Sequence, residues 1–585
     1  MKKIFILIFA AAVSFGCSGG NAGSAAESGS SKKDVCSSSE PCAEKASAQE
    51  ASVEKNDSPA AETVQEENSA ADVHAEAADA VSSVQKSAVN ELRDAPGPVS
   101  YENNAAKTAA AAGTGKKQTK VVFLIADGAG PSIFNLLREY ARYSKKSPYG
   151  GKPSNLEKMM NAGRIAYVIN GTAKTLVTDS AAAATQLATG KMTNPGNLGV
   201  DDKFFKAENL AELSKKKGLA AGVVTNTHIT DATPGAFAAH VNNRNKHEFI
   251  ALSYLDADLD VVLGGGAKYF INSSAFRLES GLRRQIPYAS KIEKEGGKLN
   301  ILPEIRQKGY DVVFDRQNLK KYNGKKLFGL FASHGMTYEI ARPEHEPPLS
   351  EMASKALEVL SKNEKGFFLM IESGIIDWVA HPNETGAVMK ELLEFDRLLG
   401  VLLAYINKNP ETLLVITADH DTGGVGFEYA HLSDKDYERR KAAGYELFSK
   451  TDGYSNGQYV AGVTDHMDYA AKENLDILAG QKKTYVDMYR EIKELSETER
   501  TPQKISDIFY EGTGLRLPAE KFTPDMGVEQ LSQVFNKETG MFWGSHNHTG
   551  APLLTVYYGN QQQLKGGVLQ NTELHDTIEE FIKSR

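Results

Sequence analysis

Five short apolar segments constrain this chain more than any other feature of its sequence. They are VVFLIAD (121–127), AAGVVTNT (220–227), DVVLGGG (260–266), GFFLMIE (366–372) and TLLVITAD (412–419). Their Val, Ile and Phe content is typical of strands, and most of them end in Gly, Asp or Glu. Strands that are apolar on both faces and alternate with helices predict a mainly parallel sheet that is covered on both sides.

Amphipathic segments between these strands supply the predicted helices. Residues 207–218 and 349–362 have apolar side chains at helical spacing, and we expect Ser350 to cap the second segment. Farther along, LLTVYYG (553–559) predicts another strand, and residues 573–585 predict a last helix. The fold class that follows is α/β, with a large, mainly parallel central sheet flanked by helices.

The alternation breaks between residues 424 and 543. This segment contains Tyr- and Lys-rich helical stretches, such as residues 477–497, and few patterns typical of buried strands. We interpret it as an insertion between two core elements that forms a cap or a dimer subdomain beside the site. The predicted folded domain therefore spans residues 119–585 and includes the 424–543 insertion.

Residues 1–17 have the features of an export leader. Two lysines precede an apolar stretch at residues 4–13, which is too short to span a bilayer, and small residues then lead to Cys17. VSFGC resembles a bacterial lipobox, although Ser14 stands where an aliphatic residue is usual. We expect Cys17 to be lipidated, with ordinary secretion as the alternative. The predicted location is the periplasm or a membrane surface of a bacterium.

Residues 18–118 have the composition of a flexible tether. They are mostly Ala, Ser and Glu, and they cannot bury enough apolar surface to offset the entropy of ordering. Cys36 and Cys42 lie in this segment and either pair in an oxidising compartment or are incidental thiols. No Cys lies beyond Cys42, so any metal ion in the folded domain must be held by oxygen and nitrogen donors. The net charge of -8 gives no reason to expect a nucleic-acid partner.

Polar side chains gather where the predicted strands end. Asp127, Glu372, Asp419 and His420 each end or follow a strand, and the polar residues 225–231 follow another. In open α/β sheets the carboxyl edge of the strands is where ligands bind. Any one carboxylate alone would be explained as an exposed loop charge or a helix cap. The set together predicts a functional site at this edge.

The segment after the fourth predicted strand has the composition of a cation site. Asp377 and His381 are four residues apart, which on a helix or tight turn places both side chains on one face. Oxygen and nitrogen donors in this arrangement suit a divalent cation.

Ser180 is the candidate nucleophile. It follows Asp179 and opens an Ala-rich helix that Gly190 ends. Free N–H groups and the positive end of the helix dipole favour an anion there, whereas an ordinary N-cap serine is the structural alternative. His228 and His240 invite a Ser–His–Asp interpretation. No GxSxG elbow surrounds Ser180, however, so activation by a metal ion is the simpler hypothesis.

Seven motifs follow one another along the chain: VVFLIADGAG, VTDSAAAATQLATG, DATPGAFAAHVNNR, DVVLGGG, IESGIIDWVAH, ITADHDTGG and HTG. Together they resemble the alkaline phosphatase family over residues 119–585, with the 424–543 insertion matching only by position. The resemblance implies a large central sheet between helices, with two Zn²⁺ and one Mg²⁺ at its carboxyl edge. It also implies hydrolysis of phosphate monoesters to an alcohol and inorganic phosphate through a phosphoserine intermediate.

The resemblance assigns ligands to each of these ions. One Zn²⁺ would bind Asp127, Asp419 and His420, together with deprotonated Ser180; the other would bind Asp377, His381 and His548; and Mg²⁺ would bind Asp127, Thr233 and Glu372.

Further roles follow from the same resemblance. Asp231 matches the position that orients a magnesium-bound water, and Arg244 matches the phosphate-binding arginine. His546 competes with His548 as a ligand, and we prefer His548 because a hydroxyl residue and Gly follow it. We expect His228 and His240 to support the structure of the site without binding metal.

One position departs from some members of the family. Trp378 follows Asp377 where those members have Lys or His. An indole N–H can donate a hydrogen bond but carries no charge, so we expect phosphate to bind less tightly than in Lys-bearing members.

Two rival functions remain at this stage. One is a phosphodiesterase or sulfatase of the same superfamily, and the other is a catalytically silent, lipid-tethered phosphate-binding protein. Thr233 and Glu372, the expected magnesium ligands, argue against a diesterase, and the sequence around Ser180 lacks a sulfatase CxPxR pattern. The expected partners are small phosphomonoester substrates, a membrane through Cys17 and a second copy in a homodimer.

Overall fold

The computed structural model describes residues 118–585 except 443, 445–446, 456–457, 469 and 562–563. The predicted leader (1–17), nearly all of the predicted tether (18–118) and the three cysteines lie outside the described residues. Within the described part of the chain, no helix has both the length and the apolar composition that crossing a membrane requires.

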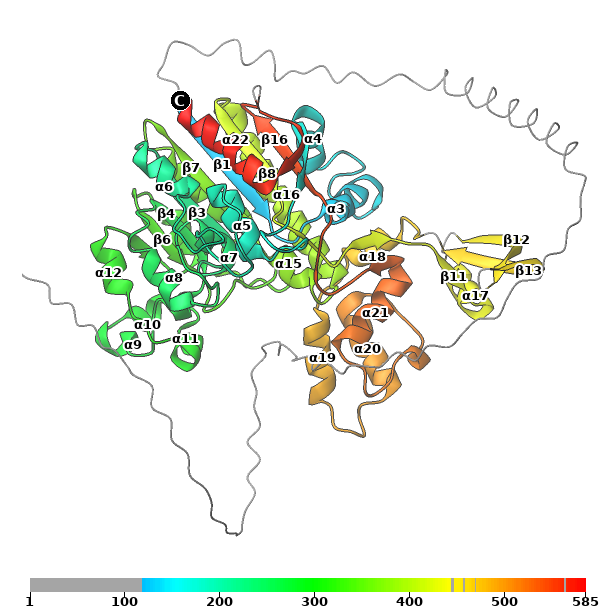
Figure 1. Ribbon diagram of the computed structural model, residues 1–585. Helices are drawn as coiled ribbons and strands as arrows, with labels where there is room; N and C mark the ends of the chain where they lie inside the picture. The colour runs from blue at the N-terminus through cyan, green and yellow to red at the C-terminus, as the bar shows by residue number, and fades with distance from the viewer. Residues whose placement is uncertain (1–117, 443, 445–446, 456–457, 469, 562–563) are drawn as a thin grey trace, which may run out of the picture. The chain divides into compact units, whose positions relative to one another are not determined.

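A ten-stranded sheet forms the centre of the fold, in the order β17-β2-β16-β8-β1-β7-β3-β4-β6-β5 (Figure 1). Its strands are β1 (Thr119–Ala126), β2 (Arg164–Ile169), β3 (Ala220–His228), β4 (Val261–Gly265), β5 (Asp311–Val313), β6 (Leu327–Leu330), β7 (Gly366–Ser373), β8 (Thr412–Thr417), β16 (Leu553–Gly559) and β17 (Gly567–Gln570). Only β16 runs antiparallel to its neighbours, β2 and β8. The predicted mainly parallel sheet is confirmed, and every strand named from the sequence belongs to it.

The central strands are buried on both faces, as their continuous apolar sequences predict. Every residue of β1, β3, β7 and β8 is buried. β1 lies between β7 and β8, and its register pairs Ile125 with Glu372 of β7. This register brings the carboxyl ends of β1 and β7 to the same level of the sheet, where polar residues follow both strands.

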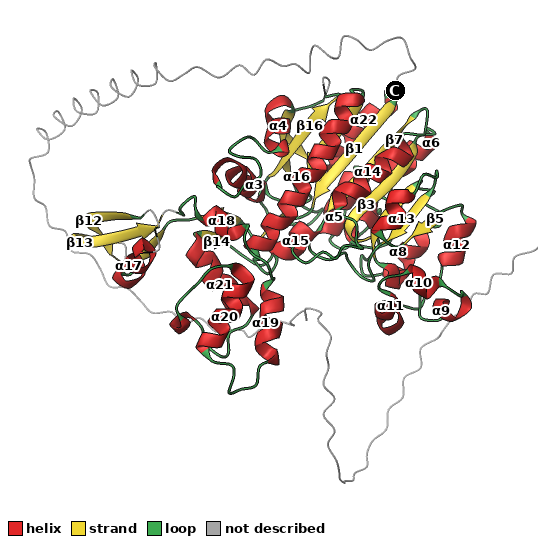
Figure 2. Cartoon of the chain, turned by 180° about the vertical axis from the view of Figure 1, so that it is seen from behind, coloured by secondary structure: helices red, strands yellow, loops and turns green. Residues whose placement is uncertain are grey.

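Helices cover both faces of the sheet (Figures 1 and 2). α14 (Leu349–Leu360) packs on α16 (Thr385–Lys408), and α5 (Ser180–Thr189) packs on α22 (Asn571–Lys583). The other helices of this part are α3 (Pro131–Tyr143), α4 (Asn155–Ala162), α6 (Leu210–Lys216), α7 (Ala232–Ala236), α8 (His247–Ser253), η2 (Ala267–Tyr269), α9 (Ala275–Leu278), α10 (Leu282–Gln285), α11 (Ala289–Glu295), α12 (Leu302–Gln307), α13 (Arg316–Lys321) and α15 (Ile375–Ala380).

Two helix starts differ from the sequence prediction. Ser350 does not cap α14, because the N-cap is Pro348 and Ser350 already lies inside the helix. The backbone N–H of Ser350 instead donates to Glu394 Oε1 of α16 at 2.9 Å, so a neighbouring helix takes over the role of a cap. α6 begins only after Asn209, whose side chain forms a capping box with Glu212.

The segment between residues 424 and 543 contains more strand than its sequence indicates. Short antiparallel strand pairs join the two ends of the segment. They are β9 (Asp421–Thr422) with β15 (His548–Thr549), and β10 (Val425–Phe427) with β14 (Met541–Trp543). A three-stranded sheet of β11 (Ala430–Leu432), β13 (Gln458–Asp468) and β12 (Phe448–Ser455) follows. The helices are α17 (Asp434–Ala442), α18 (Asn474–Leu478), α19 (Tyr485–Glu494), α20 (Pro502–Thr513), η3 (Ala519–Lys521) and α21 (Val528–Thr539). A cap or dimer role for this segment stays a prediction.

Glu384, at the N-cap of α16, joins the segment to the sheet domain. Its Oε1 accepts a hydrogen bond from Tyr485 N at 2.6 Å and its Oε2 accepts one from Gln481 Nε2 at 3.2 Å. The carboxyl group is buried, and burial raises the pKa of Glu384 from 4.5 to about 8. The folded protein therefore keeps a proton that the unfolded chain has lost between these two pH values.

This linkage predicts that Glu384 makes the folded state less stable as the pH rises from 4.5 through 8. Glu384→Gln keeps the shape but cannot ionise, so it should remove a pH-dependent loss on the order of a few kcal/mol. Urea unfolding of both proteins across this range measures the effect. The prediction would be contradicted if the unfolding free energies of the wild type and Glu384→Gln changed with pH by the same amount.

Candidate functional site

The predicted site residues converge at the carboxyl edge of the sheet. Asp127 directly follows β1, Glu372 lies near the end of β7, and Asp419 and His420 follow β8. Asp231 lies just after β3, as the N-cap of α7. All five side chains are buried or nearly so, and buried ionisable groups require compensating partners.

Asp127, Asp419 and His420 form the most buried part of the site. His420 Nε2 lies 3.4 Å from Asp127 Oδ1 and 3.3 Å from Asp419 Oδ2. Within the described part of the chain, neither of those two carboxylate oxygens has a hydrogen-bond partner. Ser180 Oγ is 3.1 Å from the same His420 nitrogen. This group thus brings together oxygen and nitrogen atoms of the kind that bind a divalent cation.

The pKa values of these three side chains also indicate a cation site. Burial raises the pKa of Asp127 well above its ordinary range, and repulsion from Asp419 and Asp377 adds to the shift. Burial and the charge of Asp377 likewise raise the pKa of Asp419 to about 6. Burial lowers the pKa of His420 to about 4, so its imidazole is neutral at neutral pH. A divalent cation would offset the repulsion among these carboxylates.

Asp377, His381 and His548 form a second group. His381 Nε2 lies 3.4 Å from Asp377 Oδ2, and His548 Nε2 lies 3.7 Å from Asp377 Oδ1. The ligand atoms of these three residues all lie within 4.8 Å of one another. The same holds for Asp127, Asp377 and His420, so Asp377 faces both groups. The sequence assigned Asp377 to one ion only; its position between the two groups became visible in the fold.

Backbone carbonyl groups orient both histidines. His381 Nδ1 lies 2.5 Å from His546 O, and His548 Nδ1 lies 2.9 Å from Thr178 O. A carbonyl accepts a hydrogen bond only from a protonated nitrogen, so in the neutral imidazole it is Nε2, the nitrogen nearer Asp377, that can bind a metal ion. His546 itself is half-exposed, and its own Nδ1 is 2.8 Å from His381 O. The structure therefore brings His548, and not His546, into the group.

Thr233 and Glu372 lie beside Asp127 on the other side. Thr233 Oγ1 is 3.4 Å from Asp127 Oδ2. Thr225 and Thr227 both donate to Glu372 Oε2, the latter at 2.9 Å. Burial and the charge of Asp231 raise the pKa of Glu372 to about 7. The two threonines were noted in the sequence only as part of a polar strand end, and the fold gives them the role of orienting Glu372.

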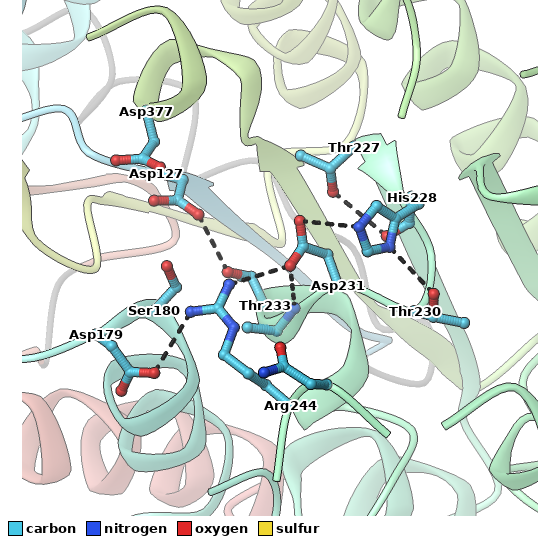
Figure 3. A network of polar contacts seen from close by, with 12 residues as sticks. Asp127, Asp179, Ser180, Thr227, His228, Thr230, Asp231, Thr233, Arg244 and Asp377 are labelled. Atoms are coloured by element: carbon cyan, nitrogen blue, oxygen red, sulfur yellow. Dashed lines mark hydrogen bonds and ion pairs between the residues drawn. The ribbon is translucent and has the colours of Figure 1, made fainter. Parts of the chain in front are cut away.

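Arg244 reaches the site between two carboxylates (Figure 3). Its Nη1 lies 3.4 Å from Asp179 Oδ2 and its Nη2 lies 3.1 Å from Asp231 Oδ1. Burial disfavours the charged guanidinium, yet Asp231 and Asp179 raise the pKa of Arg244 further above its ordinary value. Because Asp179 directly precedes Ser180, these contacts hold the guanidinium group in a fixed orientation on the Ser180 side of the site (Figure 3).

Asp179 has a function that the sequence did not single out. It is the N-cap of α5, and its Oδ1 accepts a hydrogen bond from Ala182 N at 3.0 Å. Its Oδ2 binds both Gly196 N and Arg244. Ser180 is consequently the first residue of the helix and not its cap, so its hydroxyl group is available to the site. The signal in the sequence was the Asp–Ser pair at a helix start.

The other histidines lie outside both groups. His240 contacts Gly199 O at 2.6 Å and Glu212 at 3.1 Å, at the start of α6. His228 Nε2 lies 3.6 Å from Asp231 Oδ2, and its Nδ1 lies 3.1 Å from Thr230 Oγ1. Neither arrangement forms a Ser–His–Asp triad.

A match to one protein family covers nearly all of the described residues. Residues 118–584 match the family model described as alkaline phosphatase. This chain belongs to the alkaline phosphatase family. It is 27% identical over 490 residues to alkaline phosphatase 4 of Bacillus subtilis (strain 168), covering 80% of this chain and 91% of that protein.

Solved alkaline phosphatase structures share the fold. The alkaline phosphatase of Thermus thermophilus superposes with a TM-score of 0.62 at 23% identity, covering 84% of this chain and all of that one. A TAB5 alkaline phosphatase mutant, described with Mg bound in the M3 site, superposes with a TM-score of 0.52 at 21% identity, covering 80% of this chain and 99% of that one. At these identities the likeness establishes the fold, and the site rests on its own geometry.

Proposed function

We propose that this protein hydrolyses phosphate monoesters to an alcohol and inorganic phosphate through a phosphoserine on Ser180, at a centre of two Zn²⁺ and one Mg²⁺. The observation that carries the proposal is the pair of buried carboxylate oxygens, on Asp127 and Asp419, that have no hydrogen-bond partner in the described part of the chain. Buried unpaired carboxylates are costly, and a cation is the partner that this donor set accepts.

The residues present fit the three ions. Asp127, Asp419 and His420 would hold one Zn²⁺; Asp377, His381 and His548 would hold the other; and Asp127, Thr233 and Glu372 would hold Mg²⁺, with Asp231 orienting a bound water. The oxygen-only set suits Mg²⁺, and the mixed sets suit Zn²⁺. When bound, the ions would lower the pKa of the Ser180 hydroxyl group and of water, and would neutralise charge on the leaving oxygen.

The chain's own residues supply the remaining chemistry. Ser180 Oγ attacks phosphorus, the ester P–O bond breaks, and the alcohol leaves. A water molecule then attacks the phosphoserine in line and releases inorganic phosphate and free Ser180. Arg244, held by Asp179 and Asp231, binds two phosphate oxygens with its planar fork. The N–H groups at the start of α5 add stabilisation to the same charge.

Export, a lipidated Cys17 and a homodimer complete the proposal, on sequence grounds alone. Small phosphomonoesters would then be hydrolysed outside the cytoplasm, in the periplasm or at a membrane surface.

A comparison of two chromogenic esters tests the reaction class. With Zn²⁺ and Mg²⁺ supplied, we expect p-nitrophenyl phosphate to be hydrolysed with a kcat/KM at least about a hundredfold above that of bis-p-nitrophenyl phosphate, because only a monoester leaves three phosphoryl oxygens free for Arg244 and the cations. A preference for the diester would favour a phosphodiesterase. Hydrolysis of neither ester by metal-loaded protein would favour a silent phosphate-binding protein.

A further inference from the structure

Five aromatic and imidazole rings form a cluster beside the site. The proposed reaction does not use this cluster. We call the cluster the ring shelf, and it consists of His228, His247, Tyr269, His334 and Trp378. The His228 ring lies at its centre, with centroid distances of 5.2 Å to His247, 5.3 Å to Tyr269, 4.8 Å to His334 and 6.0 Å to Trp378. The rings of Tyr269 and His247 stack at 4.6 Å.

The ring shelf lies at the carboxyl edge of the sheet, like the site itself. His228 ends β3, Tyr269 lies in η2 after β4, His334 lies in the loop after β6, and Trp378 lies in α15 after β7. Separate strands thus deliver the rings to one place.

The ring shelf joins the site at two points. Asp231 contacts Arg244 through Oδ1 at 3.1 Å and His228 through Oδ2 at 3.6 Å (Figure 3). Trp378 directly follows Asp377 on α15. A phosphate ester held by Arg244 would therefore have the ring shelf within reach of its alcohol portion.

The outer rings are accessible to a ligand. His334 is exposed, and Tyr269, His247 and Trp378 are partly exposed, whereas His228 forms a buried base. Lys268 Nζ lies 5.1 Å from the centroid of the Tyr269 ring, which adds one positive charge to the margin of the cluster.

The indole of Trp378 is held in place by close packing. A Cβ at Gly335 would lie 2.3 Å from Trp378 Cζ3, so only glycine lets the indole approach the backbone beside His334. The start of α15 is also anchored, because Asn226 Oδ1 accepts hydrogen bonds from Gly374 N at 2.7 Å and Ile375 N at 3.2 Å. Trp378 is therefore held in a fixed position within the ring shelf.

We propose that the ring shelf binds a planar heteroaromatic leaving group, which makes nucleoside monophosphates a preferred substrate class. This inference rests on the proposed function and specifies its substrate. Aromatic side chains stack on nucleobases, and the ribose supplies the spacer between the base and the phosphate at Arg244. Hydrolysis breaks the P–O bond, the nucleoside oxygen takes up a proton, and the water oxygen remains on phosphate.

Substrate competition tests the proposal. The ratio of kcat/KM for adenosine 5′-monophosphate to that for glycerol 2-phosphate should fall at least about fivefold in Tyr269→Ala and in His334→Ala, because stacking acts only on the base. If Tyr269→Ala folds poorly, His334→Ala still tests the proposal, because His334 is exposed and its loss should not affect folding. Phe249→Ala removes an exposed ring of α8 outside the ring shelf and should not change the ratio. Ratios within twofold of wild type in both shelf variants would overturn the inference.

Tryptophan fluorescence separates this inference from the proposed function. The chain has two Trp residues, so Trp543→Phe leaves Trp378 as the only indole. Adenosine should quench its emission and glycerol should not. Quenching in protein that hydrolyses no monoester would refute the proposed function and support the ring shelf as a base-binding surface. Monoester hydrolysis without quenching and without a change in the substrate ratio would refute the ring shelf alone.

Discussion

Replacing Ser180 by alanine is expected to lower kcat/KM for p-nitrophenyl phosphate by at least about a thousandfold, because no other hydroxyl group stands in its place at the start of α5. Ser180 Oγ lies 3.1 Å from His420 Nε2, next to the predicted metal ligands. Four alanines follow it in α5, so the substitution continues a sequence that already forms a helix. The loss should therefore be chemical and not structural.

The measurement needs a demonstration that the variant still binds metal and phosphate. Zinc content and the affinity for inorganic phosphate should stay close to those of the wild type, since Arg244 and the carboxylates are unchanged. Ser180→Cys is the matched variant, which keeps a nucleophile of nearly the same size. Activity of Ser180→Ala within tenfold of the wild type, at equal zinc content, would refute a phosphoserine route.

Removal of metal with EDTA is expected to abolish hydrolysis and to lower the unfolding free energy by at least a few kcal/mol, because ions bound to the native state stabilise it by mass action. Asp127, Asp377 and Asp419 are all buried and lie close enough to repel one another. Without bound cations this repulsion destabilises the folded protein. Thermal unfolding with EDTA, and again after Zn²⁺ and Mg²⁺ are returned, measures the effect.

Asp419→Asn is a control for this experiment. Its effect on the unfolding temperature should have opposite signs without and with metal. Asp419 Oδ1 accepts hydrogen bonds from Gly128 N at 3.2 Å and His420 N at 2.9 Å, and an asparagine oxygen can accept both. The substitution removes one charge from the pocket, so the metal-free variant should unfold at a higher temperature than the metal-free wild type. With metal supplied the order should reverse. The same order in both states would contradict a metal centre at these residues.

The sequence was most informative about the interior of the sheet. β16 occupies the predicted residues 553–559, and β1, β3, β4, β7 and β8 each begin and end within two residues of their predicted ends. These strands are apolar on both faces, so their pattern does not depend on neighbours that are distant in the sequence. The strands that were not predicted, β2, β5, β6 and β17, lie toward the two ends of the sheet and are short, so their sequences carry little pattern.

The sequence was least informative about the 424–543 insertion. Its three-stranded sheet combines β11 with the antiparallel pair β12 and β13. These strands mix polar and apolar residues, and such a pattern gives little signal without knowledge of what the strands face. The Ser350 cap was predicted wrongly for a related reason. Pro348 is the N-cap of α14, and Glu394, which binds the Ser350 N–H, comes from a different helix.

The residue types and their order in the sequence determined the family and the parallel sheet with chemistry at its carboxyl edge. The tertiary structure alone decided which atoms meet there: Asp377 facing both metal-ligand groups, Asp179 holding Arg244, and a shelf of rings drawn from separate strands. The physical reason is that burial and strand pattern are local properties of a sequence. Distances between side chains hundreds of residues apart depend instead on strand order and register, which only the folded sheet sets.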